Sequence, residues 1–324
     1  MSAVFFEELD IPPAAYELGV AGGTHAEMTG RMMVGAEQVL MKERPDAVLV
    51  FGDTNSTLAG ALAAAKLNIP VAHVEAGLRS FNRRMPEETN RIVTDRVAAW
   101  LFCPTQAALD NVRKEGMEER AHLVGDVMYD AALFYAGRAE QRSRVMQQLG
   151  LVRGGYVLAT CHRAETTDSA AALAGIVDAL AAVARDHVVI FPVHPRTRQA
   201  LATHQLTERL GKVRTIEPIS FLDMVALERN ARVILTDSGG VQKEAFFGGV
   251  PCVTMREETE WVETLAQGRN RLAGSSPQRI QEAFVAALSQ PPGWGHEPSP
   301  YGDGSAAKRI EACLAAGAIG GRWL

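Results

Sequence analysis

The chain alternates between short apolar runs and longer segments in which apolar and polar residues recur at helical spacing. The apolar runs are DAVLVFGD (46–53), IPVAHVEAG (69–77), AAWLFCPT (98–105), AHLVGD (121–126), GYVLATCHR (155–163), HVVIFPVH (187–194), VRTIEP (213–218), ARVILTDS (231–238) and VPCVTM (250–255). Such runs are typical of strands buried on both faces of a parallel sheet. Helices are predicted at 27–43, 54–66, 168–184, 220–230, 239–248 and 276–289. This alternation predicts an α/β fold.

The predicted strands form two groups, separated at Gly125 and Asp126 and by an Arg- and Gln-rich helical stretch near 138–149. We expect two doubly wound, Rossmann-like domains that face a cleft. The first would be residues 1–128, joined by a C-terminal helix at 305–324, and the second residues 129–304. Residues 1–16 predict a short helix and a Pro-rich loop, and the first strand is expected only near residue 46. The N-terminal domain is therefore expected to lack its first one or two strands.

Composition narrows the class of partner. The 324 residues are 47% hydrophobic and 22% charged, with a net charge of -5, the profile of a globular protein with room for two domains. The negative charge argues against nucleic acid and anionic membranes as partners and leaves a small anion. Four cysteines without a CxxC pair favour reduced thiols in a cytoplasmic protein. No apolar run reaches the length of about 18 residues that indicates a membrane span.

Charged residues gather directly after the second apolar run, in HVEAGLRSFNRRMPEETNR (73–91). Glu75, Glu87 and Arg91 lie here, and strand ends of this kind open into ligand sites in parallel sheets. The segment is either part of such a site or a solvated loop with ordinary ion pairs. Asp53 ends the preceding strand, where it either caps a helix or joins Glu75 and Glu87 in a proton-transfer set.

TDSGGVQKEAFFGGVP (236–251) predicts a phosphate site. Ser238, Gly239 and Gly240 fall where a strand turns into a helix, so free backbone N–H groups and the positive helix end would face the ligand. Glu244, one turn further on, could reach a sugar hydroxyl. The alternative is a plain Ser/Gly helix cap.

Three further candidates carry histidine and arginine. His162 and Arg163 end a strand, where they could protonate or bind a leaving phosphate. Cys161 precedes His162, but neighbours in a strand point to opposite faces, which argues against a thiol–imidazole pair. His194 begins a segment that is either a second phosphate contact or a solvated turn. A Gly-rich loop carrying His25, followed by a helix bearing Arg31, is either a mobile loop over a ligand or a flexible connection.

No HExxH, paired CxxC or calcium-loop motif is present, so a metal-centred mechanism has little support, and GxGxxG is also absent. The sequence therefore indicates neither a metal nor a nicotinamide cofactor.

Eight segments occur in order along nearly the whole chain: GDTNSTLAG, HVEAGLRS, MPEETNR, CHRAET, HPRTR, TDSGGVQKEA, MREETEW and SPYGDGSA. Together they resemble the non-hydrolysing UDP-N-acetylglucosamine 2-epimerases. The resemblance implies a glycosyltransferase-B-like fold and a cofactor-free interconversion of UDP-N-acetylglucosamine and UDP-N-acetylmannosamine by elimination and re-addition of UDP. It also implies a homodimer.

The same resemblance implies roles for individual residues. The implied catalytic residues are Asp53, Glu75, Glu87 and His162; the implied substrate-binding residues are Arg91, Arg163, His194, Phe221, Ser238, Gly239, Gly240 and Glu244; a regulatory nucleotide-sugar site would involve Arg31 and His25. Thr166 departs from the family's HRxEN pattern, which has Asn there. Two other functions stay open at this point, a non-catalytic nucleotide-sugar-binding protein and a glycosyltransferase of the same fold.

Overall fold

The computed structural model describes residues 8–290 and 299–320. It divides into two compact units, one of residues 12–131 with 298–324 and one of residues 1–11 with 132–297. The division falls within helix α6 (Val127–Arg142). The expected boundary between residues 128 and 129 stays a prediction, because compactness alone does not show which segments fold independently. The short helix expected within residues 1–16 lies partly outside the described residues.

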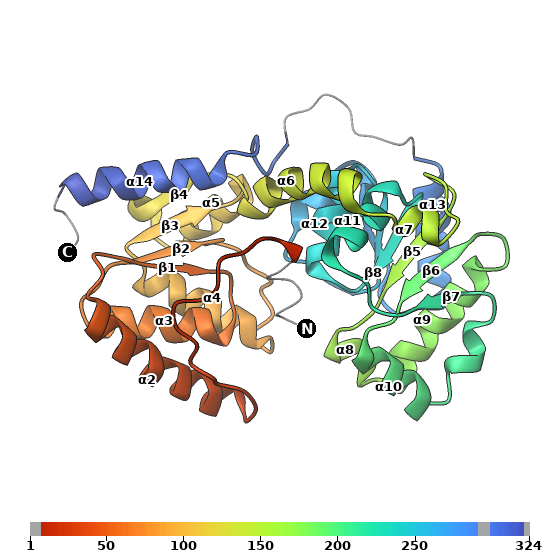
Figure 1. The fold of residues 1–324 in the computed structure, drawn as a ribbon, viewed down its shortest axis with the longest axis horizontal. Helices are drawn as coiled ribbons and strands as arrows, with labels where there is room; N and C mark the ends of the chain where they lie inside the picture. The colour runs from red at the N-terminus through yellow and green to blue at the C-terminus, as the bar shows by residue number, and fades with distance from the viewer. Residues whose placement is uncertain (1–7, 291–298, 321–324) are drawn as a thin grey trace. The chain divides into compact units, whose positions relative to one another are not determined.

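The unit of residues 12–131 and 298–324 holds a four-stranded parallel sheet in the order β1-β2-β3-β4. The strands are β1 (Val48–Phe51), β2 (Val71–Val74), β3 (Trp100–Cys103) and β4 (Ala121–Leu123). Its helices are α2 (His25–Glu43), α3 (Asn55–Lys66), α4 (Pro86–Val97), α5 (Gln106–Lys114), the 3-10 helix η1 (Glu118–Arg120) and α14 (Ala306–Gly320). Figure 1 shows α14 on one face of this sheet and α2 and α3 on the other.

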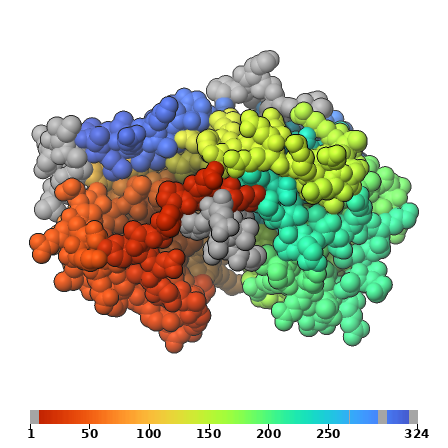
Figure 2. All heavy atoms as spheres, viewed as in Figure 1, coloured from red at the N-terminus to blue at the C-terminus, as the bar shows by residue number. Residues whose placement is uncertain are grey.

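Helix α14 covers the sheet with a single apolar stripe. Ile310 is buried in a cluster with Val74 of β2 and Phe102 of β3. Lys308 and Glu311 on the same helix are exposed, and Figure 2 shows α14 as a blue band on the molecular surface. Spacing of one buried residue per helical turn, with charged residues between, is the pattern of a helix that lies on a sheet with one side in water.

The other unit holds a six-stranded parallel sheet in the order β10-β9-β8-β5-β6-β7. The strands are β5 (Val157–Thr160), β6 (Val189–Pro192), β7 (Arg214–Ile216), β8 (Val233–Thr236), β9 (Cys252–Thr254) and β10 (Asn270–Leu272). Counted along the chain from β5, this is the doubly wound Rossmann order, which reverses direction between β5 and β8. The prediction of an α/β fold with two parallel, Rossmann-like sheets is confirmed.

Helices cover both faces of the larger sheet. The helical elements are α7 (Val145–Gln148), α8 (Ala164–Thr167), α9 (Ala170–Val183), α10 (Pro195–Thr203), η2 (Thr207–Leu210), α11 (Phe221–Asn230), α12 (Gly239–Gly248), η3 (Val262–Gly268) and α13 (Pro277–Leu288). One apolar cluster joins α9, α10 and α13 to the sheet, and a second joins α6, α7, α11 and α12 to it. Within the described part of the chain, no helix is long and apolar enough to cross a membrane.

The hydrophobic periodicity of the sequence did not predict helix α4 or strand β10, which carry polar residues where an apolar face is expected. Helix α4 buries Glu88, Arg91 and Asp95, so it shows no apolar face in the sequence. Strand β10 has only three residues, two of them polar, and its sequence carries no strand pattern. The helical stretch predicted near 138–149 is the end of α6 and the short α7, which Ser143 and Arg144 separate.

Candidate active site

The larger sheet reverses its winding between β5 and β8. A side-chain hydrogen bond links the two strands at their carboxyl ends. They pair in parallel, and the hydroxyl groups of Thr160 and Thr236 lie 2.6 Å apart. Open α/β sheets bind ligands in the crevice at such a reversal point. The residues that follow β5 are His162 and Arg163, and those that follow β8 include Ser238. The structure thus brings two of the sequence-predicted motifs together.

Asp237 fixes the turn after β5. Its buried carboxylate accepts hydrogen bonds from the backbone N–H of His162, at 3.1 Å, and of Arg163, at 3.0 Å. The side chain of Asp237, in the segment after β8, therefore holds the backbone of the segment after β5. Sequence reasoning did not single out Asp237, because its partners lie 74 and 75 residues away in the chain.

Helix α12 begins at this point. The Ser238 hydroxyl accepts from the backbone N–H of Val241, and α12 starts at Gly239. The first backbone N–H groups of a helix have no partner inside the helix, and the helix dipole makes this end positive. Gly239 is buried and adds no side chain of its own at that end. The geometry suits an anion such as phosphate.

His162 lies beside this helix end with a lowered pKa. Burial lowers the pKa of its imidazole below the ordinary value, and His194 and Arg163 act in the same direction, while Asp237 opposes them. The rings of His162 and His194 are 5.8 Å apart. His162 is thus neutral near pH 7 in the free protein, and an anion bound next to it would favour its protonated form.

The segment after β6 serves partly as a helix cap. The Nδ1 atom of His194 accepts from the backbone N–H of Arg196, in the first turn of α10. Arg196 pairs with Asp168, and Arg198 pairs with Glu217, all at exposed positions. The two arginines of the HPRTR segment are therefore engaged with carboxylates of the same unit, which leaves His194 as its candidate ligand contact.

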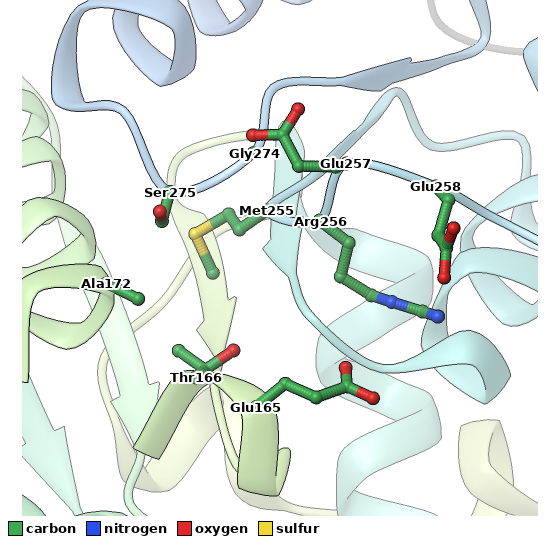
Figure 3. Close-up of a pocket in the computed structure, with 9 residues that line it drawn as sticks. All are labelled: Glu165, Thr166, Ala172, Met255, Arg256, Glu257, Glu258, Gly274 and Ser275. Atoms are coloured by element: carbon green, nitrogen blue, oxygen red, sulfur yellow. The ribbon is translucent and has the colours of Figure 1, made fainter. Parts of the chain in front are cut away.

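A cavity of about 350 Å³ opens beside α8. Its lining residues are Glu165, Thr166, Ala172, Met255, Arg256, Glu257, Glu258, Gly274 and Ser275. Figure 3 shows the side chains of Glu165, Arg256 and Glu258 extending toward one another. Arg256 is nearly fully buried and pairs with Glu260, at 3.3 Å. Sequence reasoning did not assign these residues, although most lie in or next to the quoted MREETEW and CHRAET segments.

Glu244 is held by a second, fully buried carboxyl group. Burial raises the pKa of Glu228 well above its ordinary value, and the neighbouring Glu244, to which it is hydrogen-bonded, raises it further. Burial also raises the pKa of Glu244, against the effect of Lys243 and of Glu228. Glu228 is therefore the protonated partner. It fixes the orientation of Glu244, the residue predicted to bind a sugar hydroxyl.

Replacing Glu228 by Gln should stabilise the protein at high pH. The folded chain holds the Glu228 proton that the unfolded chain releases above pH ~4.3, so this group's contribution to stability is lost as pH rises. E228Q keeps a hydrogen-bond donor and avoids that loss. We expect E228Q to be more stable than the wild type at pH 8, by an amount that shrinks toward pH 5, measured by urea unfolding. The exposed Glu208→Gln is the control; a loss of stability in E228Q at pH 8 would contradict the assignment.

Phe221 begins α11, and both its backbone and its ring make contacts within the protein. The backbone N–H groups of Phe221 and Leu222 donate to the carboxylate of Glu8, at 2.9 and 3.1 Å. The Phe221 ring meets the edge of Tyr135 at 5.3 Å between centroids. A side chain therefore already caps this helix end, and binding of substrate by Phe221 stays a prediction.

In the smaller unit, Asp53 follows β1 and is the first of a series of ion-paired side chains. Its carboxylate pairs with the buried guanidinium of Arg91, which also pairs with Glu88 at 2.9 Å. Glu88 in turn accepts from the backbone N–H of Ser80 and of Phe81. Arg91 was predicted, whereas nothing in the sequence pattern assigns a role to Glu88. It anchors the loop after β2 to α4.

Glu75 and Glu87 complete the predicted acids. Glu75 follows β2 with a φ of 69°, a left-handed conformation that is uncommon for a residue with a side chain. A methyl group on Gly52 would lie 3.3 Å from its Oε2 atom, so the carboxylate lies close to the residue before Asp53. Glu87 is in the first turn of α4 and half-buried. Strained backbone at a strand end is a feature of functional sites.

A buried network that the sequence did not reveal supports these acids. The carboxylate of Asp95 meets Nδ1 of His73 and Nη1 of Arg79, each at 2.7 Å, and accepts from the backbone N–H of Gly77 at 3.2 Å. Burial favours the neutral acid, but His73 and Arg79 hold the pKa of Asp95 below its ordinary value. Nε2 of His73 lies 2.7 Å from the carbonyl oxygen of Gly52. The network thus fixes the residue that precedes Asp53.

The prediction for His25 needs a correction. His25 is the first residue of α2 and does not lie in the preceding loop, because Thr24 and Glu27 form a capping box that starts the helix there. Nδ1 of His25 meets the side-chain amide of Asn55, and Asn90 links that amide to the Asp53 carbonyl. Arg31 is exposed and donates to the carbonyl oxygens of Ala21 and Gly22, which holds the Gly-rich loop. A regulatory role for either stays a prediction.

The cysteines take no visible part in this chemistry. Cys103, Cys161, Cys252 and Cys313 are free thiols. Burial raises the pKa of Cys161 well above its ordinary value, and Asp237 raises it further, so the thiolate nucleophile is disfavoured. Across residues 8–290 and 299–320, no cluster of three or more His, Cys, Asp or Glu side chains is arranged to hold a metal ion.

Comparisons with known proteins match the chain to UDP-sugar 2-epimerases. The family model described as UDP-N-acetylglucosamine 2-epimerase matches residues 1–315. The chain is 50% identical over 322 residues to a UDP-2,3-diacetamido-2,3-dideoxy-D-glucuronate 2-epimerase of Pseudomonas aeruginosa, covering 97% of this chain and 87% of the relative. It is 43% identical to a UDP-N-acetylglucosamine 2-epimerase of Methanocaldococcus jannaschii, covering 98% and 88%.

The fold is similar to solved structures over nearly its whole length. The crystal structure of the Methanocaldococcus jannaschii UDP-GlcNAc 2-epimerase, in complex with UDP-GlcNAc and UDP, matches with a TM-score of 0.90. The match covers 98% of this chain and 88% of that one.

Proposed function

The chain belongs to the UDP-N-acetylglucosamine 2-epimerase family, and from that premise we propose that it inverts C2 of a UDP-linked 2-acetamido sugar. The observation that carries the proposal is the set of acids at the carboxyl ends of β1 and β2. Asp53 is paired with Arg91, and Glu75 is held in a strained conformation beside Gly52. A sugar transfer reaction leaves these acids without a purpose, whereas an epimerase must remove and return a proton.

The nucleotide end of the substrate is assigned to the larger unit. The diphosphate would accept hydrogen bonds at the start of α12 from Gly239 and Gly240, beside Arg163. Glu244, oriented by Glu228, would accept from a ribose hydroxyl. The start of α12 is suited to a leaving group whose charge grows as it departs.

The reaction proceeds by elimination and re-addition. A carboxylate among Asp53, Glu75 and Glu87 takes the C2 proton, a C1–C2 double bond forms, and the C1–O bond breaks with its electron pair going to UDP. His162 takes up a proton from solvent when the anionic diphosphate binds, stabilises the departing charge, and releases that proton when the product leaves. Another of the three residues, which carries a proton at the start, then protonates C2 on the opposite face while UDP adds back to C1. Exchange with solvent returns both acids to their starting state. Protons and electrons balance without a cofactor.

The substrate we favour is UDP-N-acetylglucosamine, with UDP-N-acetylmannosamine as its product. A specific observation favours a second candidate, because the Pseudomonas aeruginosa relative at 50% identity is named for a diacetamido uronate. The two substrates differ at C3 and in a carboxylate at C5, so parallel assays separate them. Incubation with each UDP-sugar, followed by NMR of the anomeric signals, should show conversion of UDP-N-acetylglucosamine. Conversion of the uronate alone would overturn the substrate assignment but keep the reaction class.

Replacing Gly239 by Ala should block the diphosphate site. The added methyl group would lie 2.9 Å from Glu260 Oε1 and 3.3 Å from Trp261 Nε1, in the space at the start of α12, so the Glu260 side chain must move to make room. We expect UDP affinity, measured by calorimetry on the folded variant, to fall at least roughly tenfold, in line with loss of charge-assisted bonds. Gly248→Ala, later in the same helix, is the matched control.

A further inference from the structure

Trp261 carries a buried donor for which the described residues supply no acceptor. The residue is 6% exposed, and its indole Nε1 atom has no hydrogen-bond partner within the described residues. A buried N–H group without a partner is costly and uncommon, so each case needs an explanation. Neither the sequence motifs nor the reaction proposed above gives Trp261 a role.

The indole nitrogen lies at the start of α12. A methyl group on Gly239 would be 3.3 Å from Trp261 Nε1, 2.9 Å from Glu260 Oε1 and 3.5 Å from Arg163 Nη2. Three polar side-chain atoms thus surround one point at the first residue of the helix. Two of them are donors and the helix end itself is positive, which favours a bound anion, whereas the Glu260 carboxylate opposes it.

Glu260 supplies an oxygen near this point in the free protein. Its carboxylate pairs with Arg256 at 3.3 Å and with Arg163 at 3.8 Å, and it is nearly buried. Even so, the Trp261 N–H finds no acceptor there. An entering anion would compete with Glu260 for Arg163 and would supply the acceptor that the indole lacks.

The position of Trp261 is set by neighbours that do not use its indole N–H group. Its backbone N–H donates to Thr259, and its carbonyl accepts from Thr264. The ammonium group of Lys243 lies 3.8 Å from the centre of the indole ring, a cation–π contact. The ring is therefore held on the side of α12 before any ligand arrives.

We propose that Trp261 is a binding residue for the nucleoside diphosphate, to which it donates its indole N–H beside the first turn of α12. The inference rests on the proposed function for the identity of the ligand. It adds a neutral donor to the cationic and backbone donors of this site. Phosphate oxygen atoms that bridge the helix end and the indole would satisfy both.

Trp261→Phe tests the inference because it removes the N–H group and keeps an aromatic ring. We expect the UDP dissociation constant, measured by calorimetry, to rise roughly tenfold, as for loss of a hydrogen bond to a charged group. The ligand-free variant should lose some stability, because phenylalanine fills less of the buried site and contacts Lys243 less well, so the affinities are compared at a temperature where both proteins are folded. Trp100→Phe, in β3 of the other unit, is the matched control and should bind UDP as wild type does.

An NMR measurement separates binding from a structural role. The chain has four tryptophans, and W261F identifies the indole N–H signal of Trp261. UDP should move that signal downfield in the wild-type protein. A wild-type protein that binds UDP with the signal unmoved, or a W261F variant with wild-type affinity, would overturn the inference alone. A wild-type protein that fails to bind UDP would overturn the proposed function, and the inference with it.

Discussion

Asp53→Asn should lower kcat by a factor of about 10²–10⁴, the range for loss of a positioned general acid or base. The amide has the shape of the carboxylate but cannot accept the C2 proton. Arg91 keeps its second carboxylate partner, Glu88, at 2.9 Å, so the fold around the site should hold. The rate of epimerisation, followed by NMR of the anomeric signals, gives the effect directly.

The control for this variant is Asp46→Asn. Asp46 is exposed and lies before β1, at the end of the strand away from Asp53. It should leave kcat unchanged. A D53N enzyme with at least roughly a third of the wild-type kcat, far above the loss expected for a general acid or base, would remove Asp53 from the proton-transfer set. Glu75 and Glu87 would then carry the reaction.

Asp95→Asn should cost about 3–5 kcal/mol of the free energy of unfolding, the range for breaking a buried ion pair by removing one partner. The substitution leaves Arg79 and His73 beside a neutral group in a buried site. Because the pKa of Asp95 is lowered in the folded chain, its contribution is present above pH ~3.9 and is lost as pH falls through the folded value. Urea unfolding at pH 7 measures the loss.

Asp110→Asn provides the contrast for the buried network. Asp110 pairs with Arg113 on the exposed side of α5, where an ion pair contributes about 1 kcal/mol at most. We expect its removal to change stability by less than that amount. A comparable loss in the two variants, or a loss under about 1 kcal/mol in D95N, would show that the Asp95 network does not stabilise the fold as a buried ion pair should.

The sheets and the strand-end motifs are predictable from the sequence because both depend on local pattern. Parallel strands are apolar on both faces, and the carboxyl ends of such strands carry ligand residues, so the pattern alone points to His162, Ser238 and Asp53. The strand order is not predictable in the same way. It depends on which strands pair across the chain, as β5 does with β8, and no local pattern encodes that pairing.

The residues that sequence reasoning missed act through burial and distant partners. Asp95 meets a histidine 22 residues away, and Glu228 is neutral only because the fold buries it beside Glu244. In the sequence each is an ordinary acid on a helix. Trp261 is an ordinary apolar residue there, and only the folded chain shows that its N–H lacks an acceptor among residues 8–290 and 299–320. Helix α4 was missed for a related reason, since its buried side is charged.

Solvent exchange at C2 tests the central claim most directly. UDP-N-acetylglucosamine is incubated with the protein in deuterium oxide, and the C2 position of the epimerised product is examined by NMR and mass spectrometry. Elimination and re-addition predict that the product carries deuterium at C2, because the proton taken by the acids is replaced from solvent. A product that keeps its hydrogen at C2, or UDP binding without any exchange, would contradict the account.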